Sequence, residues 1–78
     1  MRKTLNEVAL DCDAKINELR IKSDIKHRLM DLGIIKGSII KPVFKSPSGD
    51  PVAYLVKGTV IALREQTTSK IFVEEVLT

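Results

Sequence analysis

The sequence has few aromatic residues and a single cysteine. It contains no tryptophan, one tyrosine and two phenylalanines among 78 residues. A hydrophobic core must therefore be built from isoleucine, leucine and valine, and the many β-branched residues favour strands. The lone cysteine, Cys12, cannot form a disulfide within the chain, which is typical of a protein from a reducing compartment.

Long apolar runs and an export signal are also missing. The uninterrupted apolar stretches are a few residues long, far short of the ~20 residues that span a bilayer. Met1 is followed by charged and polar residues instead of the apolar segment of a signal peptide. We expect a cytoplasmic protein without membrane insertion. Its length predicts one small domain, residues 1–78.

The charge is unevenly distributed along the chain. The net charge is +3, and residues 20–64 hold nine basic and three acidic side chains. Such a segment suits an acidic protein surface, an anionic lipid or nucleic acid, although these lysines also fit the solvent-facing positions of strands. Aromatic residues that stack on bases are not interleaved with the basic ones. Nucleic acid is therefore the less favoured partner.

No arrangement of residues typical of catalysis is present. The only histidine, His27, and the only cysteine, Cys12, fall in unrelated segments without a nucleophile elbow. Cys12 stands between Asp11 and Asp13, which could attract a divalent ion. Three adjacent residues cannot all converge on one ion, however, and zinc usually takes four ligands from separate places. We expect no enzyme and no resident cofactor, with Cys12 and His27 as weak candidates for transition-metal binding.

A short helix is predicted from residue 23 to residue 33. Ser23 is a suitable N-cap, and Asp24 places a negative charge at the positive end of the helix dipole. One apolar stripe at helical spacing consists of Ile25, Leu29 and Leu32. His27 falls opposite this stripe and is expected to be solvated.

The end of this helix is marked by glycine. Gly33 suits the left-handed position after the helix, and Ile34 can then close on Leu29 as in a Schellman motif. Asp24 and Arg28 have the spacing and order of a favourable helix ion pair. A structural role for Arg28 at the helix edge is the simplest interpretation, and a partner's carboxylate is the alternative.

Short strands separated by turns make up the rest of the chain. Strands are predicted over residues 14–21, 38–45, 52–57, 59–64 and 70–76. Residues 46–51 and 57–58 are turns, residues 65–69 form one helical turn, and residues 4–8 dock Leu5 and Val8. This pattern predicts a mainly β protein, a small and strongly bent barrel with one short helix.

Alternation along the strands predicts which side chains face the core. In the second strand Ile40, Pro42 and Phe44 should point inward, and Pro42 indicates an edge strand or a bulge. In the last strand Phe72 should point outward, between the inward positions 71 and 73. Leu55, like Phe72, falls opposite the inward set, which predicts either an exposed apolar contact patch or packing of the helix against the barrel.

The order of several motifs resembles a known family. Arg28-Leu-x-x-Leu-Gly-Ile-x-x-Gly37 is followed by Pro47-x-Gly-Asp-Pro51, then by Gly58-x-x-Ile-Ala-Leu-Arg64 and Ile71-x-Val73. This set resembles the ferrous iron transport protein A (FeoA) family over roughly residues 4–76. The residues that mark the resemblance structurally are Leu29, Leu32, Gly33, Gly37, Gly49, Asp50, Pro51 and Gly58.

The resemblance implies an SH3-like barrel of about five strands with a helix inserted after the first strand. It also implies a cytoplasmic accessory protein without catalytic activity, which regulates the ferrous iron permease of the Feo system by protein contact. Two departures concern local strand geometry: the segment from Leu10 to Asp13 lacks a usual glycine, and Pro42 replaces a β-branched residue.

The hypothesis we favour is an adaptor that docks on the cytoplasmic part of this permease. Candidate contact residues are Arg28, Leu55, Val60 and Phe72. One alternative is a small nucleic-acid-binding barrel that uses the basic middle of the chain. Another is a direct Fe²⁺ sensor, in which a homo-oligomer pools Cys12 or His27 from two copies.

Overall fold

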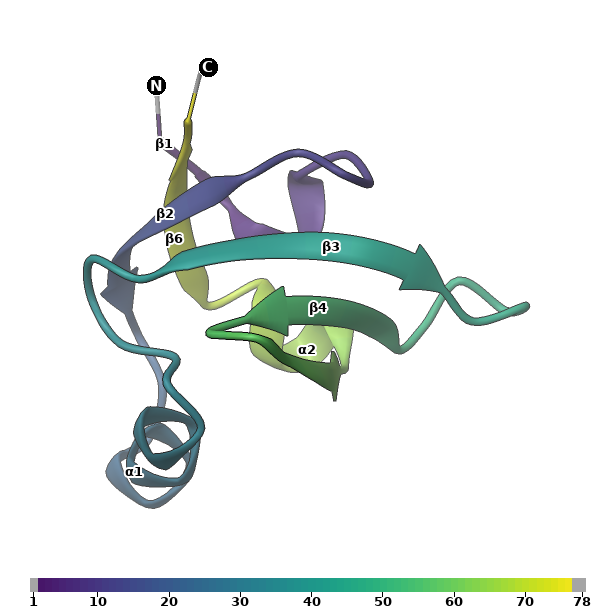
Figure 1. The fold of residues 1–78 in the computed structure, drawn as a ribbon. Coiled ribbons are helices and arrows are strands. Elements are labelled where there is room, and N and C mark those ends of the chain that lie inside the picture. Colours follow the sequence, from purple (N-terminus) through teal and green to yellow (C-terminus); the bar gives the residue numbers. More distant parts are fainter. Residues whose placement is uncertain (1, 77–78) are drawn as a thin grey trace.

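The computed structural model describes residues 2–76 as one six-stranded antiparallel sheet with three short helical elements (Figure 1). The strands are β1 (Arg2–Thr4), β2 (Ala14–Leu19), β3 (Ile39–Lys45), β4 (Val52–Val56), β5 (Thr59–Leu63) and β6 (Ile71–Glu75). The helical elements are the 3₁₀ turn η1 (Leu5–Glu7), α1 (Ser23–Asp31) and α2 (Glu65–Thr68). Neighbouring strands follow the order β1-β6-β2-β3-β4-β5. Within residues 2–76, no helix is long and apolar enough to cross a membrane.

The predicted mainly β architecture is confirmed, with one more strand than expected. Arg2–Thr4 pairs with β6 in the register Lys3↔Val73, so α1 follows the second strand instead of the first. The predicted strands, the helical turn after residue 64 and the docking of Leu5 and Val8 are all present.

A single core fills the inside of the bent sheet. Its most buried members come from η1, β2, β3, β4 and β6, together with one residue after α1: Leu5, Ile16, Ile34, Ile40, Tyr54, Val56, Ile71 and Val73. The inward positions of Ile71 and Val73 agree with the prediction. Burial raises the pKa of the Tyr54 hydroxyl, which the nearby Thr68 hydroxyl partly offsets. Tyr54 is thus a core residue and does not offer its ring to a partner.

A bulge in β3 changes the face on which Phe44 lies. Pro42 pairs with Tyr54, but Phe44 pairs with Ala53, so one extra residue is inserted between the two pairs. The predicted bulge at Pro42 is confirmed, and β3 is an inner strand between β2 and β4. The prediction of Phe44 as a core residue is wrong, because the bulge reverses the alternation and leaves its side chain 59% exposed.

The end of α1 forms the predicted Schellman motif. Gly33 has φ of +93°, its N–H donates to the Met30 carbonyl, and the Ile34 N–H donates to the Leu29 carbonyl. The loop then turns again at Gly37, where φ is also +93°. The chain turns at these two glycines and then enters β3, as the sequence predicted.

The start and the apolar face of α1 differ from the prediction. The N-cap is Lys22, and Ser23 is the first helical residue without a capping side-chain hydrogen bond, because the helix begins one position earlier than expected. Of the predicted stripe, only Leu29 is buried, while Ile25 is 38% and Leu32 is 44% exposed. Figure 1 shows the reason: α1 lies beyond one end of the sheet and does not cover a face of it.

Asp50 connects the hairpin turn to α2. Its Oδ1 accepts a hydrogen bond of 2.9 Å from the Glu65 N–H at the start of α2. Gly49, next to it, has φ of +90°, and the turn between β4 and β5 places Lys57 and Gly58 at positive φ. The turn before β4 and the start of α2 are thus held together by the Asp50 side chain.

Candidate partner-binding groove

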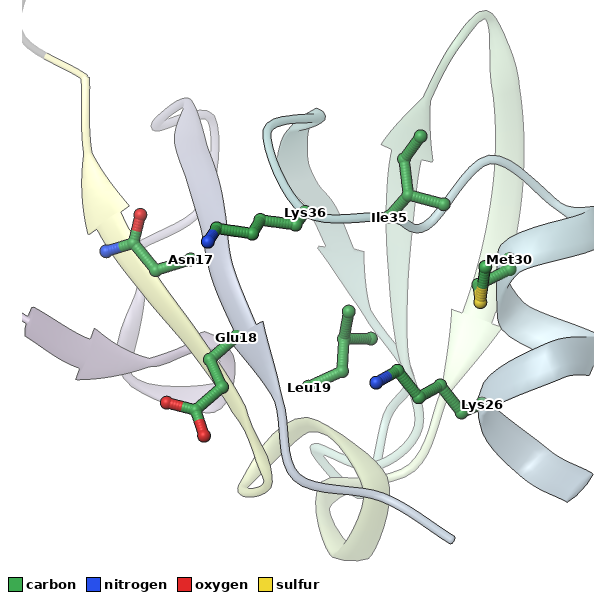
Figure 2. A pocket seen from close by; sticks show the side chains of 7 residues that line it. All are labelled: Asn17, Glu18, Leu19, Lys26, Met30, Ile35 and Lys36. Atoms are coloured by element: carbon green, nitrogen blue, oxygen red, sulfur yellow. The ribbon is translucent and has the colours of Figure 1, made fainter. Parts of the chain in front are cut away.

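A groove of about 490 Å³ lies between the second half of β2 and α1 (Figure 2). Its walls come from β2, from α1 and from the loop that follows α1. The lining residues are Asn17, Glu18, Leu19, Lys26, Met30, Ile35 and Lys36. At its β3 end the groove is bounded by the chain at Gly37 and Ser38, which is hydrogen-bonded to Ile16 of β2.

One wall of the groove is a strand edge without a strand partner. On the β6 side, β2 is paired up to Leu19↔Ile71 with a bulge between Ile16 and Glu18, but on the β3 side its register ends at Lys15↔Ile39. Beyond that pair, Ile16 bonds Ser38 and Gly37, with its N–H donating to the Ser38 carbonyl and its carbonyl accepting from the Gly37 N–H. Within residues 2–76, positions 17–19 of β2 thus have no strand beside them on the groove side.

Two lysines stand at different points along this edge, one near Asn17 and the other near Leu19 (Figure 2). Figure 2 shows Lys26 extending from α1 toward Leu19, and Lys36 extending from the loop toward Asn17. Among residues 2–76, neither ammonium group lies within ion-pair distance of a carboxylate. Both positive charges are therefore available to an acidic ligand.

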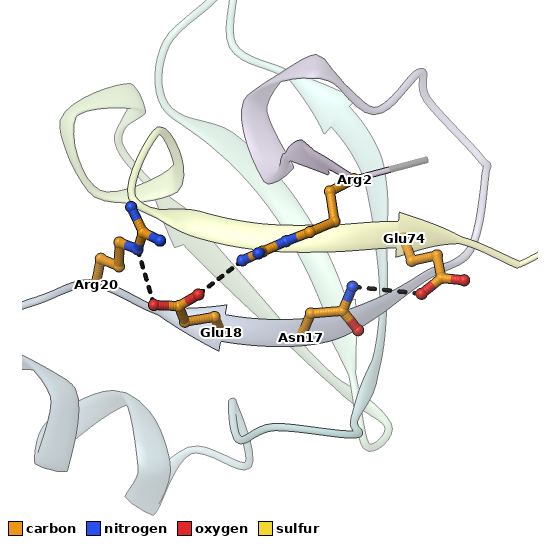
Figure 3. Close-up of polar contacts among 5 residues, drawn as sticks. All are labelled: Arg2, Asn17, Glu18, Arg20 and Glu74. Atoms are coloured by element: carbon orange, nitrogen blue, oxygen red, sulfur yellow. Dashed lines mark hydrogen bonds and ion pairs between the residues drawn. The ribbon is translucent and has the colours of Figure 1, made fainter.

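The other charged residue that lines the groove, Glu18, forms ion pairs with two arginines (Figure 3). The Glu18 carboxylate accepts hydrogen bonds from Arg20 at 2.8 Å and from Arg2 at 2.7 Å. These two contacts, with Arg20 the larger, hold the pKa of Glu18 below its usual range. Both guanidinium groups also stack over the Phe72 ring, with Cζ 4.9 Å (Arg2) and 4.8 Å (Arg20) from its centroid.

A second hollow extends the groove toward the N-terminal strand. It measures about 440 Å³ and shares Asn17, Glu18 and Lys36 with the groove, adding Arg2 and Glu74. Asn17 Nδ2 donates to Glu74 Oε1 at 3.4 Å across this hollow. The two hollows together form one trough along β2, with basic side chains at both ends.

The four candidate contact residues do not form one surface. Leu55 and Val60 are cross-strand neighbours on the outer face of β4 and β5, and Val60 is 58% exposed. Phe72 points outward as predicted but is half-buried under the arginines, and Arg28 is exposed on α1. The predicted Asp24–Arg28 ion pair is not among those formed by residues 2–76. The role of these four residues in partner contact stays a prediction.

The metal-binding candidates lie apart. Cys12 is exposed in the loop before β2, and His27 is exposed on α1. Across residues 2–76, no three histidine, cysteine or carboxylate side chains come together in a way that could hold a metal ion. Any site built on Cys12 or His27 would need ligands from a second copy.

Sequence reasoning did not find the groove itself. Lys26, Met30, Ile35 and Lys36 were not among the residues that the motifs pointed to. One signal was present: Met30 and Ile35 are apolar but fall off the Ile25–Leu29–Leu32 stripe. The free edge of β2 had no signal, because strand pairing depends on where the chain returns after α1.

The comparison with protein families decides the classification. The model of the FeoA domain matches residues 3–75.

This chain belongs to the FeoA family.

Solved structures agree with the assignment. A FeoA-like protein from Clostridium acetobutylicum is 32% identical with a TM-score of 0.85, covering 99% of this chain and 90% of its own. FeoA from Stenotrophomonas maltophilia, complexed with zinc and described as an SH3 domain protein, is 32% identical with a TM-score of 0.75, covering 91% and 88%. The SH3-like fold expected for a FeoA chain is thereby confirmed.

A longer relative shows the same fold within a larger chain. Iron(II) transport protein A from Clostridium thermocellum is 27% identical with a TM-score of 0.88 over 94% of this chain. The match spans only 45% of that protein's own length. A search of the curated proteins finds no match to this sequence.

Proposed function

We propose that this chain is an accessory protein of ferrous iron uptake, which acts in the cytoplasm by binding the membrane permease of the Feo system. The observation that carries the proposal is the FeoA domain match over residues 3–75. Relatives that share the fold are described as an iron(II) transport protein and as a candidate activating factor of ferrous iron transport.

The geometry supports a role in binding rather than in catalysis. The groove combines apolar side chains, unpaired lysines and a free strand edge, which are features that recognise a protein segment. The two side chains best suited to nucleophilic chemistry, Cys12 and His27, are exposed on separate elements. The chain thus regulates transport by contact and performs no reaction of its own.

Capture of the permease tests this proposal directly. The tagged chain is incubated with detergent-solubilised membranes of the source organism, and bound proteins are identified by mass spectrometry. The ferrous iron permease should be the enriched membrane protein. Enrichment equal to that obtained with a tagged SH3 domain of unrelated origin would contradict the proposal.

A second candidate function is direct metal sensing, because the Stenotrophomonas maltophilia relative forms a complex with zinc. In this chain the site would combine Cys12 or His27 from two copies. Equilibrium dialysis against Fe²⁺ or Zn²⁺, with Cys12→Ser and His27→Gln variants as controls, measures the metal bound. Retention that both variants lose, accompanied by a dimer in sedimentation, would favour sensing; no retained metal would exclude it.

A further inference from the structure

We propose that the groove between β2 and α1 binds an extended acidic segment of a partner protein, which adds a strand to the free edge of β2. This inference deepens the function proposed above and rests on it for the identity of the partner. Three features of the groove carry it: the unpaired edge, the two lysines and the apolar floor.

The unpaired edge selects an extended segment. Glu18 and Leu19 of β2 pair with β6 on one side, after a bulge at Asn17, and have an open groove on the other side. Backbone N–H and C=O groups on an open edge are satisfied by water or by an added strand, and an added strand gains affinity through main-chain hydrogen bonds. A helix or a flat bilayer surface offers no such ladder of donors and acceptors.

The charges select an acidic segment. Lys26 and Lys36 stand along the edge without a carboxylate partner among residues 2–76, and Arg2 stands at the far end of the trough. Glu18 in the groove wall is already shared by Arg2 and Arg20, and Glu74 in the adjoining hollow accepts a hydrogen bond from Asn17. Carboxylates on the bound segment would therefore meet net positive charge at both lysines.

The apolar floor selects a segment with alternating side chains. Leu19 is nearly buried, whereas Met30 is 42% and Ile35 is 37% exposed along the groove. In an added strand, alternate side chains point to opposite faces. The set that faces the groove would cover Met30 and Ile35, and carboxylates next to it would reach Lys26 and Lys36 at the groove rim.

A pair of designed peptides tests charge and shape. The probe is a fluorescein-labelled peptide of about six residues, a usual strand length, in which valine and glutamate alternate. Its control replaces each glutamate with lysine. Fluorescence anisotropy at low salt should show binding of the glutamate peptide only, weakening as salt screens the lysines. No binding of the glutamate peptide, or equal binding of both peptides, would overturn the proposal.

Matched variants locate the binding site. The double variant Lys26→Glu/Lys36→Glu should bind the glutamate peptide at least about tenfold more weakly, since each reversed contact replaces attraction by repulsion. Lys45→Glu/Lys70→Glu makes the same charge change at exposed lysines outside the groove and should leave binding within about twofold. Equal loss in both variants would overturn the groove as the site. Circular dichroism establishes that both variants are folded.

N-methylated peptides test strand addition specifically. Methylating alternate backbone nitrogens on one edge of the peptide removes the hydrogen bonds on that edge and keeps every side chain. One of the two alternate sets should abolish binding, and the other should leave it intact. Equal binding of both methylated peptides would overturn strand addition.

Two further outcomes separate this inference from the proposed function. If vesicles of phosphatidylserine and phosphatidylcholine bind the chain through Lys26 and Lys36 while the peptide does not, the groove is a lipid site and the inference is wrong. Capture of the permease that the Lys26→Glu/Lys36→Glu variant retains would leave the proposed function standing and refute the groove as its contact.

Discussion

Gly33 and Gly37 share one backbone conformation in different surroundings. Both have φ of +93°, but a Cβ on Gly33 would lie 3.2 Å from Lys57 Cγ, whereas a Cβ on Gly37 would meet nothing within 4 Å. The left-handed conformation costs an L-residue about 1–2 kcal/mol. Crowding against Lys57 adds to that cost at Gly33 only.

Replacing each glycine by alanine separates these two costs. We expect Gly37→Ala to lower the free energy of unfolding by about 1 kcal/mol and Gly33→Ala to lower it more, measured by urea denaturation. A larger loss in Gly37→Ala would show that the contact with Lys57 is not a constraint on the corner.

Glu18 and Glu7 have depressed pKa values for different reasons. Hydrogen bonds from Arg20 and Arg2 lower the pKa of Glu18, whereas the Thr4 backbone N–H and then the Thr4 hydroxyl lower that of Glu7. A carboxyl whose folded-state pKa lies below its unfolded value stabilises the fold above the unfolded pKa. That contribution is lost as the pH falls through the folded-state pKa.

Removing one arginine should therefore affect one carboxyl only. In Arg20→Gln, the pKa of Glu18 rises toward its usual range while that of Glu7 stays where it is, measured by NMR titration of the side-chain carboxyl carbons. An unchanged pKa of Glu18 would contradict the assignment of Arg20 as its main partner.

At the scale of elements, the two helices are capped in different ways. α1 has no side-chain cap at its start and ends in the Gly33 Schellman motif, whereas the first N–H of α2 is bonded by Asp50 from a distant turn. Asp50 was recognised in the sequence as part of a Gly-Asp-Pro turn. Its cap was not predictable, because residues 50 and 65 meet only when β4 and β5 pair.

Two alanine variants compare these caps. Asp50→Ala should lower the free energy of unfolding by about 1 kcal/mol, a typical loss for a capping side chain. Ser23→Ala should change it by less than about 0.5 kcal/mol, because the Ser23 hydroxyl makes no capping bond. Thermal denaturation of both variants measures the difference. A loss in Ser23→Ala as large as in Asp50→Ala would restore Ser23 as the N-cap.

At the scale of the whole molecule, the sequence predicted the fold better than the groove. Alternation placed Ile40, Ile71 and Val73 in the core, and the glycines placed the turns, because both signals are local. Phe44 was predicted on the wrong face, because a bulge at Pro42 shifts the register of β3. Ile25 was predicted in the apolar stripe of α1 but is exposed, because α1 does not lie on a face of the sheet. The groove arises from β2, α1 and their connecting loop together, so no single segment encodes it.

The trough along β2 is the part of the molecule that most resembles a binding site. It joins a free strand edge to unpaired lysines. The proposed binding to the permease is therefore expected to use that trough.

Ferrous iron uptake in cells tests this account most directly. Cells that lack the gene are complemented with the wild-type chain, with Lys26→Glu/Lys36→Glu, or with the charge-matched Lys45→Glu/Lys70→Glu, all expressed at equal level. Uptake of radioactive Fe²⁺ should be restored by the wild type and by the control pair and should stay low with the groove variant. Uptake that is unaffected by loss of the gene, or fully restored by the groove variant, would contradict the account.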